Sequence, residues 1–218
     1  MIHLSKRLSS IYNLTPKGIA IDVGADHGQL IISLVENDIA EHGYAVENKK
    51  GPYERMVKAI NASKVKDKIT PIFASGISKM PEDVKTVIIA GMGGSTIISI
   101  LKDDIDKLAH VDTIIIDSHG AFSFVREEMV KMGYQIDNET ILVEDNIYYE
   151  IIHFVRGYEN YSEDDYSFGP CLRNTKNPLY IQKWNKRLNK IEELLLLDID
   201  DKRRNELLKE KEAILRNI

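Results

Sequence analysis

Short apolar runs alternate with longer amphipathic segments over most of the chain. The runs at residues 18–24, 43–47, 68–74, 86–94 and 112–117 predict strands, because they are brief and bounded by polar residues or glycine. Apolar residues at helical spacing predict helices at residues 3–14, 28–38, 52–63, 95–108 and 122–134. Strands that alternate with helices in this way predict an α/β fold, with a mostly parallel sheet covered on both faces.

The pattern changes after residue 134. Two strand-like runs, at residues 139–145 and 148–157, lie only a few residues apart and predict an antiparallel hairpin at the end of the sheet. Further on, apolar residues recur at three- and four-residue steps typical of a coiled-coil seam, at Ile181, Trp184, Leu188, Ile191 and Leu195. A second helix follows, with Asp200 or Asp201 as its expected N-cap. We therefore expect a sheet domain at residues 1–156, a connector at 157–177, and an antiparallel two-helix coiled coil at 178–218.

Composition narrows the compartment and the partners. The 218 residues include one cysteine, Cys171, which excludes an internal disulfide and favours a reducing, cytoplasmic location. No window has the apolar length that a membrane span needs, so we expect no membrane contact. The net charge of −5 argues against non-specific coating of nucleic acid, because that binding depends on neutralising phosphates. The oligomeric state stays open between a monomer and a weak dimer.

The first strand and helix are joined by a turn that carries Asp22, Asp26 and His27. In open α/β sheets such a turn lines the ligand crevice at the carboxyl ends of the strands. Gly24 and Gly28 relieve steric pressure on the backbone there. The turn nevertheless lacks the G-x-G-x-x-G spacing of dinucleotide-binding proteins. Asp26, beside His27, would also repel a pyrophosphate. The turn therefore favours a ligand that carries positive charge.

S-adenosylmethionine meets this requirement, because it carries a sulfonium and an ammonium group and no phosphate. Glu47 ends the second strand, where an acidic residue commonly accepts hydrogen bonds from ribose hydroxyls. The alternative is that Asp22 and Glu47 only cap helices. The glycine-rich stretch at residues 88–94, with Met92 as an adaptable apolar contact, would let the backbone approach a flat ligand closely.

Taken together, the motifs resemble bacterial tRNA (adenine-N1)-methyltransferases that use S-adenosylmethionine and modify adenosine 22 of tRNA. The resemblance covers nearly the whole chain and is carried by "LSKRL", "DVGADHG", "AVENKKGPY", "IAGMGG", "YYEII" and "GPCLRNTKNPLYIQKW". It implies a Rossmann-like class I methyltransferase sheet. The residues that we expect at the cofactor are Asp22, Val23, Gly24, His27, Glu47, Asn48, Pro52, Ser75, Gly76, Ala90, Gly91, Met92 and Gly93.

Two positions depart from the family pattern. Ser75 stands where the family usually has an acidic residue that binds the adenine amino group of the cofactor. Asp117, Ser118 and His119 replace the Gln-Pro-Asn that commonly follows the fifth strand. The second departure lies on the substrate-facing side of the pocket, so the base that this chain accepts stays open.

Chemistry at adenine N1 sets the expected catalytic role. N1 has an in-plane lone pair and no proton at neutral pH, so the protein needs only to align the reactants and stabilise positive charge on the ring. We expect Asp26 to do this as the catalytic residue, accepting a hydrogen bond from the exocyclic amino group. The remaining histidines show no metal-binding spacing, and no metal is expected.

Residues 171–190 contain several cations and no Asp or Glu, which favours contact with RNA phosphates. Trp184 lies among them, although its place in the coiled-coil seam favours a core role. The expected tRNA-binding residues are Lys6, Arg7, His119, Arg173, Lys176, Lys183, Lys186 and Arg187. The alternatives are a non-catalytic nucleotide-binding regulator, a methyltransferase for another RNA base, a protein or a small molecule, and an NAD-dependent enzyme.

Overall fold

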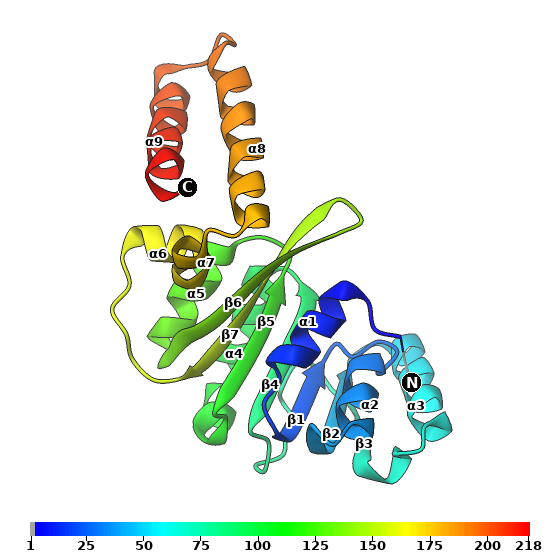
Figure 1. Ribbon diagram of the computed structural model, residues 1–218. Helices are drawn as coiled ribbons and strands as arrows, with labels where there is room; N and C mark the ends of the chain where they lie inside the picture. Colours follow the sequence, from blue (N-terminus) through cyan, green and yellow to red (C-terminus); the bar gives the residue numbers. More distant parts are fainter. Residues whose placement is uncertain (1–2) are drawn as a thin grey trace.

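The computed structural model describes residues 3–218 and contains a seven-stranded sheet with helices on both faces (Figure 1). The strand order is β3-β2-β1-β4-β5-β7-β6, so the chain starts in the middle and builds outward to both edges. β1 to β5 are parallel, and β7 runs antiparallel to β5 and β6. The strands are β1 (Gly18–Val23), β2 (Ala40–Glu47), β3 (Ile69–Phe73), β4 (Thr86–Met92), β5 (Thr113–Ser118), β6 (Tyr134–Glu144) and β7 (Ile147–Arg156). This confirms the predicted fold class.

Helices divide between the two faces of the sheet. α1 (Lys6–Leu14), α2 (Gln29–Glu36) and α3 (Lys50–Ala62) share one core with Ile115, whereas α4 (Gly94–Asp103) and α5 (Phe122–Lys131) share the other with Ile114 and Ile116. Successive side chains of a strand point to opposite faces, so an unbroken apolar run such as that of β5 feeds both cores. This double coverage leaves the carboxyl ends of the strands as the place for a ligand.

The β6–β7 hairpin projects past the end of β5. Its two-residue turn consists of Asp145 and Asn146, whose φ angles are 50° and 63°, as the tight hairpin turns with two left-handed residues require. β7 pairs with β5 as far as Ile151, opposite Asp117, but its pairing with β6 continues to Ile147. The first residues of β7 therefore extend over the carboxyl edge of the parallel sheet.

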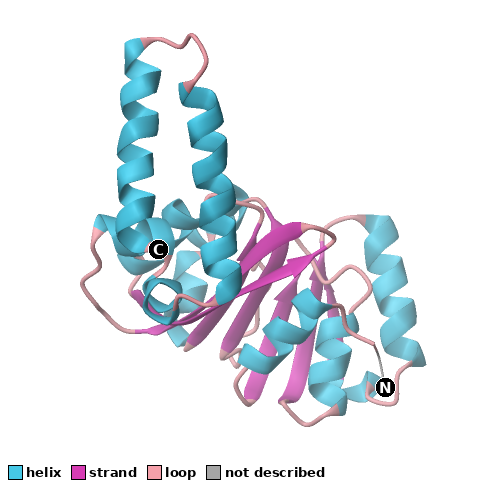
Figure 2. Ribbon diagram, turned by 45° about the horizontal axis from the view of Figure 1, so that its top comes forward, coloured by secondary structure: helices cyan, strands magenta, loops and turns pink. Residues whose placement is uncertain are grey.

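The predicted connector contains two short helices, α6 (Glu163–Phe168) and α7 (Pro170–Thr175). Beyond it, α8 (Pro178–Leu195) and α9 (Asp201–Asn217) lie side by side as a helical hairpin that stands away from the sheet (Figures 1 and 2). Asp200 caps α9 by accepting a hydrogen bond from the Arg203 backbone N–H at 2.8 Å. The two helices share a core with the connector and β6, made of Ile141, Phe168, Leu172, Tyr180, Leu188, Ile191, Leu207 and Ile214.

Two predicted helices end earlier than the sequence pattern suggested. The helix expected to reach residue 108 stops at Asp103, and a short 3-10 helix, η2 (Ile105–His110), follows it. The helix expected to reach residue 134 stops at Lys131, because Gly133 adopts a φ of 85° that ends the helical path. Tyr134 then begins β6 rather than closing a helix.

A buried ion network fastens the helical hairpin to the sheet. The Arg126 side chain is fully buried, and its Nε and Nη2 atoms donate to Glu139 at 2.6 Å and to Glu150 at 2.7 Å. Lys183 of α8 reaches the same Glu150 carboxylate. Arg126 Nη1 also donates to the carbonyl oxygen of Tyr166 at 3.1 Å, so α5, α6, α8, β6 and β7 meet at one charge cluster.

Replacement of Arg126 by Met should lower the free energy of unfolding by about 3–5 kcal/mol, because two buried carboxylates would then lose their shared cation. Urea unfolding monitored by circular dichroism measures this loss. As a control, Lys190→Met removes a lysine whose ion pair with Glu193 is exposed, and it should change stability by less than about 1 kcal/mol. Equal effects of the two substitutions would show that the Arg126 network is not an anchor.

Candidate active site

The carboxyl ends of β1, β2 and β4 enclose a cavity of about 380 Å³. Its wall combines the first turn, the end of β2, the loop after β3 and the glycine-rich end of β4, as the strand order predicts for a ligand crevice. The predicted cofactor residues that line this cavity are Val23, Gly24, Glu47, Asn48, Pro52, Ser75, Gly76, Ala90, Gly91 and Met92, together with the predicted catalytic residue Asp26.

The first turn is shaped by backbone conformations that favour glycine. Gly24 has a φ of 80°, and a Cβ atom there would lie 2.5 Å from the Cε atom of Met92. Asp26 adopts the left-handed conformation as well, with a φ of 44°. The Met92 side chain therefore reaches across the mouth of the turn and rests against its glycine.

Glu47 holds this turn in place. Its Oε1 atom accepts a hydrogen bond from the Asp26 backbone N–H at 2.9 Å, and the residue is only 9% exposed. The Gly24 and Ala25 backbone N–H groups bond to the Val46 carbonyl oxygen at 2.9 and 3.1 Å. The carboxylate of Glu47 is thus fixed at the cavity wall, which is the arrangement that hydrogen bonding to a ribose would need.

Asp22 lines a second, smaller cavity of about 140 Å³ that adjoins the first and shares Gly24, Asp26 and Ala90 with it. Burial raises the pKa of the Asp22 carboxyl to about 7, and the neighbouring charge of Glu47 adds to this effect. A cation in the cavity would favour the ionised form. The predicted residue His27 also lines this smaller cavity, whereas Gly93 lines neither cavity and instead caps α4.

Asp26 is more exposed than its predicted role suggests. Its side chain is 57% exposed, and its Oδ1 atom accepts a hydrogen bond from Arg55 Nη2 at 3.2 Å. His27 Nε2 lies 3.5 Å from the other carboxylate oxygen. Arg55 lies on α3, 29 residues along the chain, and no spacing pattern could have linked it to Asp26.

Thr96 and Ile100 of α4 also line the larger cavity and were missed. They are four residues apart and therefore lie on one face of a helix. Their spacing, next to the glycine-rich loop at residues 88–94, was a usable signal for the wall of the cavity.

Arg7 also lines the smaller cavity, and it meets Asp117 beside the glycine-rich loop. Arg7 Nε lies 3.4 Å from Asp117 Oδ2, and the guanidinium lies over the Tyr149 ring, 5.2 Å from its centroid. The exposed His119 ring lies 6.2 Å from the same ring. Lys6 joins this region through its backbone N–H, which donates to Glu144 at 2.8 Å.

The structure does not gather the predicted tRNA-binding cations into one free patch. Arg173 pairs with Asp165, Lys183 with Glu150, and Arg187 with Glu210. Lys176 donates to the carbonyl oxygen of Ile218 at 3.2 Å. Lys186 is different, because its Nζ atom lies 5.9 Å from the centroid of the Tyr148 ring at a groove described below.

Within residues 3–218, no group of His, Cys, Asp and Glu side chains has an arrangement that could hold a metal ion. No helix in this part of the chain is long and apolar enough to cross a membrane.

The fold and the site define a Rossmann-like methyltransferase that uses S-adenosylmethionine. The acidic residues fit this cofactor, since the buried carboxyl of Asp22 faces a cavity where an ammonium group would stabilise its charge. The glycine turns at Gly24 and Gly91 leave room for close approach. Residues 20–218 match the family model described as tRNA (adenine(22)-N(1))-methyltransferase. The chain belongs to this family.

Relatives agree with this assignment. The tRNA (adenine(22)-N(1))-methyltransferase of Bacillus subtilis is 29% identical over 195 residues, which cover 86% of this chain and 82% of the relative. A candidate tRNA (m1A22) methyltransferase of Streptococcus pneumoniae, solved with S-adenosyl-L-methionine, is 34% identical with a TM-score of 0.92, covering 98% of this chain and 99% of that one. M. capricolum TrmK, solved with S-adenosyl-homocysteine, is 26% identical with a TM-score of 0.89, covering 98% and 96%. The predicted family, activity and cofactor are confirmed.

Asp22 should make the cofactor-free protein less stable as pH rises. Its folded pKa of about 7 lies above the ordinary value of 3.8, so the stability that its proton contributes is complete below pH 3.8 and is lost as pH rises through 7. Asp22→Asn should therefore be more stable than the wild type at pH 8, by roughly 4 kcal/mol at most, with a smaller difference at pH 5.5.

Urea unfolding at both pH values measures this difference. The same variant should bind S-adenosylmethionine about tenfold to a hundredfold more weakly, because a charge-assisted contact is lost. Asp67→Asn, in the exposed 3-10 helix η1 (Lys66–Lys68), should change neither property. If Asp22→Asn were less stable than the wild type at pH 8, the buried Asp22 carboxyl would not be destabilising at this site, and the prediction would be wrong.

Proposed function

We propose that this chain methylates N1 of adenosine 22 in tRNA, using the cavity at the carboxyl ends of β1, β2 and β4. The observation that carries the proposal is the buried carboxyl of Asp22 facing a cavity whose wall includes Glu47 and the glycine turns. That site suits a cationic nucleoside, and the family assignment supplies the tRNA substrate. A tRNA substrate also supports a location in the cytoplasm.

The reaction requires the protein only to align the reactants and to stabilise the positive charge that develops on the adenine ring. S-adenosylmethionine supplies a methyl group bonded to a positively charged sulfur. Asp22 and Glu47 would hold the amino acid and ribose parts of this molecule, and the Gly91 and Met92 backbone would flank its methyl-bearing end. The adenine N1 lone pair then needs to point at the methyl carbon, which orientation by the pocket accomplishes without a general base.

Asp26 is placed to offset the charge that moves onto the adenine ring. It lines both cavities, so its carboxylate faces the space between the cofactor and an incoming base. Arg55 Nη2 donates to one of its oxygens at 3.2 Å, which restricts the direction in which the carboxylate points. Fixed charge of this kind stabilises a transition state because it requires no reorganisation during the reaction.

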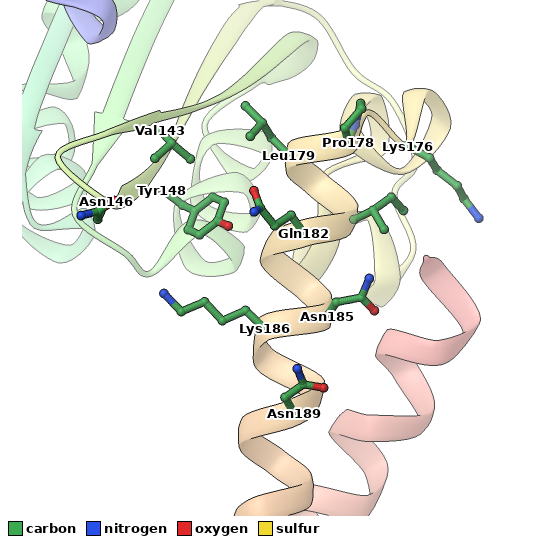
Figure 3. Close-up of a pocket in the computed structure, with 11 residues that line it drawn as sticks. Val143, Asn146, Tyr148, Lys176, Pro178, Leu179, Gln182, Asn185, Lys186 and Asn189 are labelled. Atoms are coloured by element: carbon green, nitrogen blue, oxygen red, sulfur yellow. The ribbon is translucent and has the colours of Figure 1, made fainter.

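The β6–β7 hairpin connects this site to a second surface. Tyr149 lies beside Arg7 and His119 at the mouth of the site, and the adjacent Tyr148 points to the opposite face of the hairpin. There it lines a groove of about 1100 Å³ between the hairpin and α8 (Figure 3). One short element thus places an aromatic ring at each of two neighbouring surfaces.

The groove has the chemistry of an RNA-binding surface. None of the residues that line it is acidic, and the lining includes the side-chain amides of Asn146, Gln182, Asn185 and Asn189; Gln182 and Lys186 extend toward Tyr148 (Figure 3). Amides and lysines suit phosphate and sugar contacts, and the Tyr148 ring offers a face for an unstacked base. We infer that tRNA is gripped here while adenosine 22 is exposed to the site at a cost of a few kcal/mol.

Asp26→Asn should lower the turnover number about a hundredfold, because the charge near the reacting base is lost while the shape remains. Methyl transfer from labelled S-adenosylmethionine to unmodified tRNA measures this. The dissociation constant for tRNA should stay within about twofold of the wild type. Glu54→Gln, which removes an exposed carboxylate from the same helix as Arg55, is the matched control and should keep full turnover. Normal turnover by Asp26→Asn would remove Asp26 from the mechanism.

Lys186→Glu should weaken tRNA binding by about tenfold or more, because it places an anion in a groove without acidic residues. Cofactor affinity should not change. The control is Lys66→Glu, at an exposed site in η1 that precedes β3 at the opposite edge of the sheet. Filter binding with tRNA and calorimetry with S-adenosylmethionine separate the two affinities. A loss of both affinities, or of neither, would count against the groove as the tRNA surface.

A further inference from the structure

Asp117 is a buried carboxylate without adequate partners. Its side chain is 0% exposed near the end of β5, beside the Gly91 backbone N–H and Arg7 Nε, but neither of its oxygens accepts a hydrogen bond of good geometry within residues 3–218. The Arg7 Nε atom beside it is also buried and makes no hydrogen bond there. Buried polar groups in proteins are almost always paired, so an arrangement of this kind requires an explanation.

Electrostatic attraction accounts for the position of Arg7. The distance of 3.4 Å between Arg7 Nε and Asp117 Oδ2 gives attraction without a hydrogen bond. The Tyr149 ring supports the guanidinium from a second side. Asp117 and Tyr149 therefore fix where the guanidinium lies, while its two terminal nitrogens remain available.

The terminal nitrogens of Arg7 face the glycine turn of the cofactor cavity. A Cβ atom on Gly91 would lie 3.7 Å from both Nη1 and Nη2, and 3.9 Å from Nε2 of His119. Gly91 itself lines the cavity. The donors of Arg7 therefore lie at the rim where a nucleotide must pass to bring its base to the site.

A planar guanidinium with two free donors matches the geometry of a phosphate. The adenine ring is a poorer partner, because it gains positive charge during methylation and would be repelled by a neighbouring cation. A phosphate stays anionic throughout the reaction. The charge on the substrate therefore favours the backbone of the RNA as the ligand of Arg7.

We propose that Asp117 is a positioning residue that holds the Arg7 guanidinium over the Gly91 turn, where Arg7 binds a phosphate next to the target adenosine. This proposal rests on the proposed function and adds to it the group that seats the nucleotide. Of these two residues, only Arg7 touches the substrate. Asp117 acts through Arg7.

A pH dependence follows from the surroundings of Asp117. Burial raises the pKa of its carboxyl to about 6, while the charges of Arg7 and His119 oppose this effect and that of Glu144 adds to it. These groups lie on α1, after β5 and at the end of β6, and the Tyr149 hydroxyl lies on β7. The carboxylate is ionised above pH 6 and protonated below, so its hold on Arg7 should weaken as pH falls through 6.

The test is a double-mutant cycle on tRNA binding with Arg7→Ala and Asp117→Asn, measured at several salt concentrations. Each single variant should weaken binding about tenfold, and Arg7→Ala should reduce the salt dependence by the equivalent of about one phosphate contact. Asp117→Asn should have no further effect when Arg7 is already Ala. Arg7→Lys should restore the salt dependence but only part of the affinity, because the fork is lost.

The pH profile separates positioning from a structural role. Wild-type binding of tRNA should weaken between pH 7 and 5.5, and Asp117→Asn should lack that step. Asp117→Asn should melt at or above the wild-type temperature, because it removes a buried charge. Additive effects of the two substitutions, or a wild-type pH profile in Asp117→Asn, would overturn the proposal. An Arg7→Ala variant that loses turnover with unchanged tRNA affinity would instead place Arg7 on the base.

Failure of the proposed function gives a different result. Tight tRNA binding by the wild type without methyl transfer would refute the proposed function. The double-mutant cycle on Arg7 and Asp117 could still be measured, because it depends on tRNA binding alone. Normal methyl transfer with wild-type tRNA affinity in Asp117→Asn would refute the positioning role alone.

Discussion

Burying a carboxyl group without a full set of hydrogen bonds costs free energy, and this chain does so twice at the carboxyl edge of its sheet. Asp22 is the penultimate residue of β1 and Asp117 that of β5, and burial raises the pKa of both. Each faces a place where a cationic group can sit, either the ammonium of the cofactor or the guanidinium of Arg7. Burial of these carboxyl groups means that positive charge bound at this edge would be stabilising, as the proposed function requires.

The buried network around Arg126 shows what the same fold does when a charge is structural. There, each carboxylate has a cation at hydrogen-bond distance, and Glu150 has two, from Arg126 and Lys183. Lys183 extends this ion network into α8, so paired charges hold the helical hairpin to the sheet. The contrast between satisfied and unsatisfied carboxylates separates the anchor of the molecule from its reactive edge.

Local patterns in the sequence predicted most of the fold. The alternation of apolar runs and amphipathic segments predicted β1 to β5 in parallel, because burial on both faces demands unbroken apolar strands. The residues that line the larger cavity were predictable for the same reason, since turns after parallel strands meet at one edge. Contacts between distant segments were not predictable. Arg55 contacts Asp26 across 29 residues of sequence. Arg7 of α1 contacts Asp117 of β5, which lies far away along the chain.

The cations of residues 171–190 show why charge segregation along a sequence is weaker evidence than charge in space. This stretch contains no acidic residue, yet Arg173, Lys183 and Arg187 find carboxylates on other elements. Once these are paired, the positive character of the surface rests on fewer groups, with Lys186 beside Tyr148 at the groove. Since the β6–β7 hairpin supplies both Tyr148 at the groove and Tyr149 at Arg7, any shift of that hairpin would move both contacts together. If tRNA binds at the groove and a phosphate binds at Arg7, as proposed, this one two-stranded element would link the two contacts mechanically.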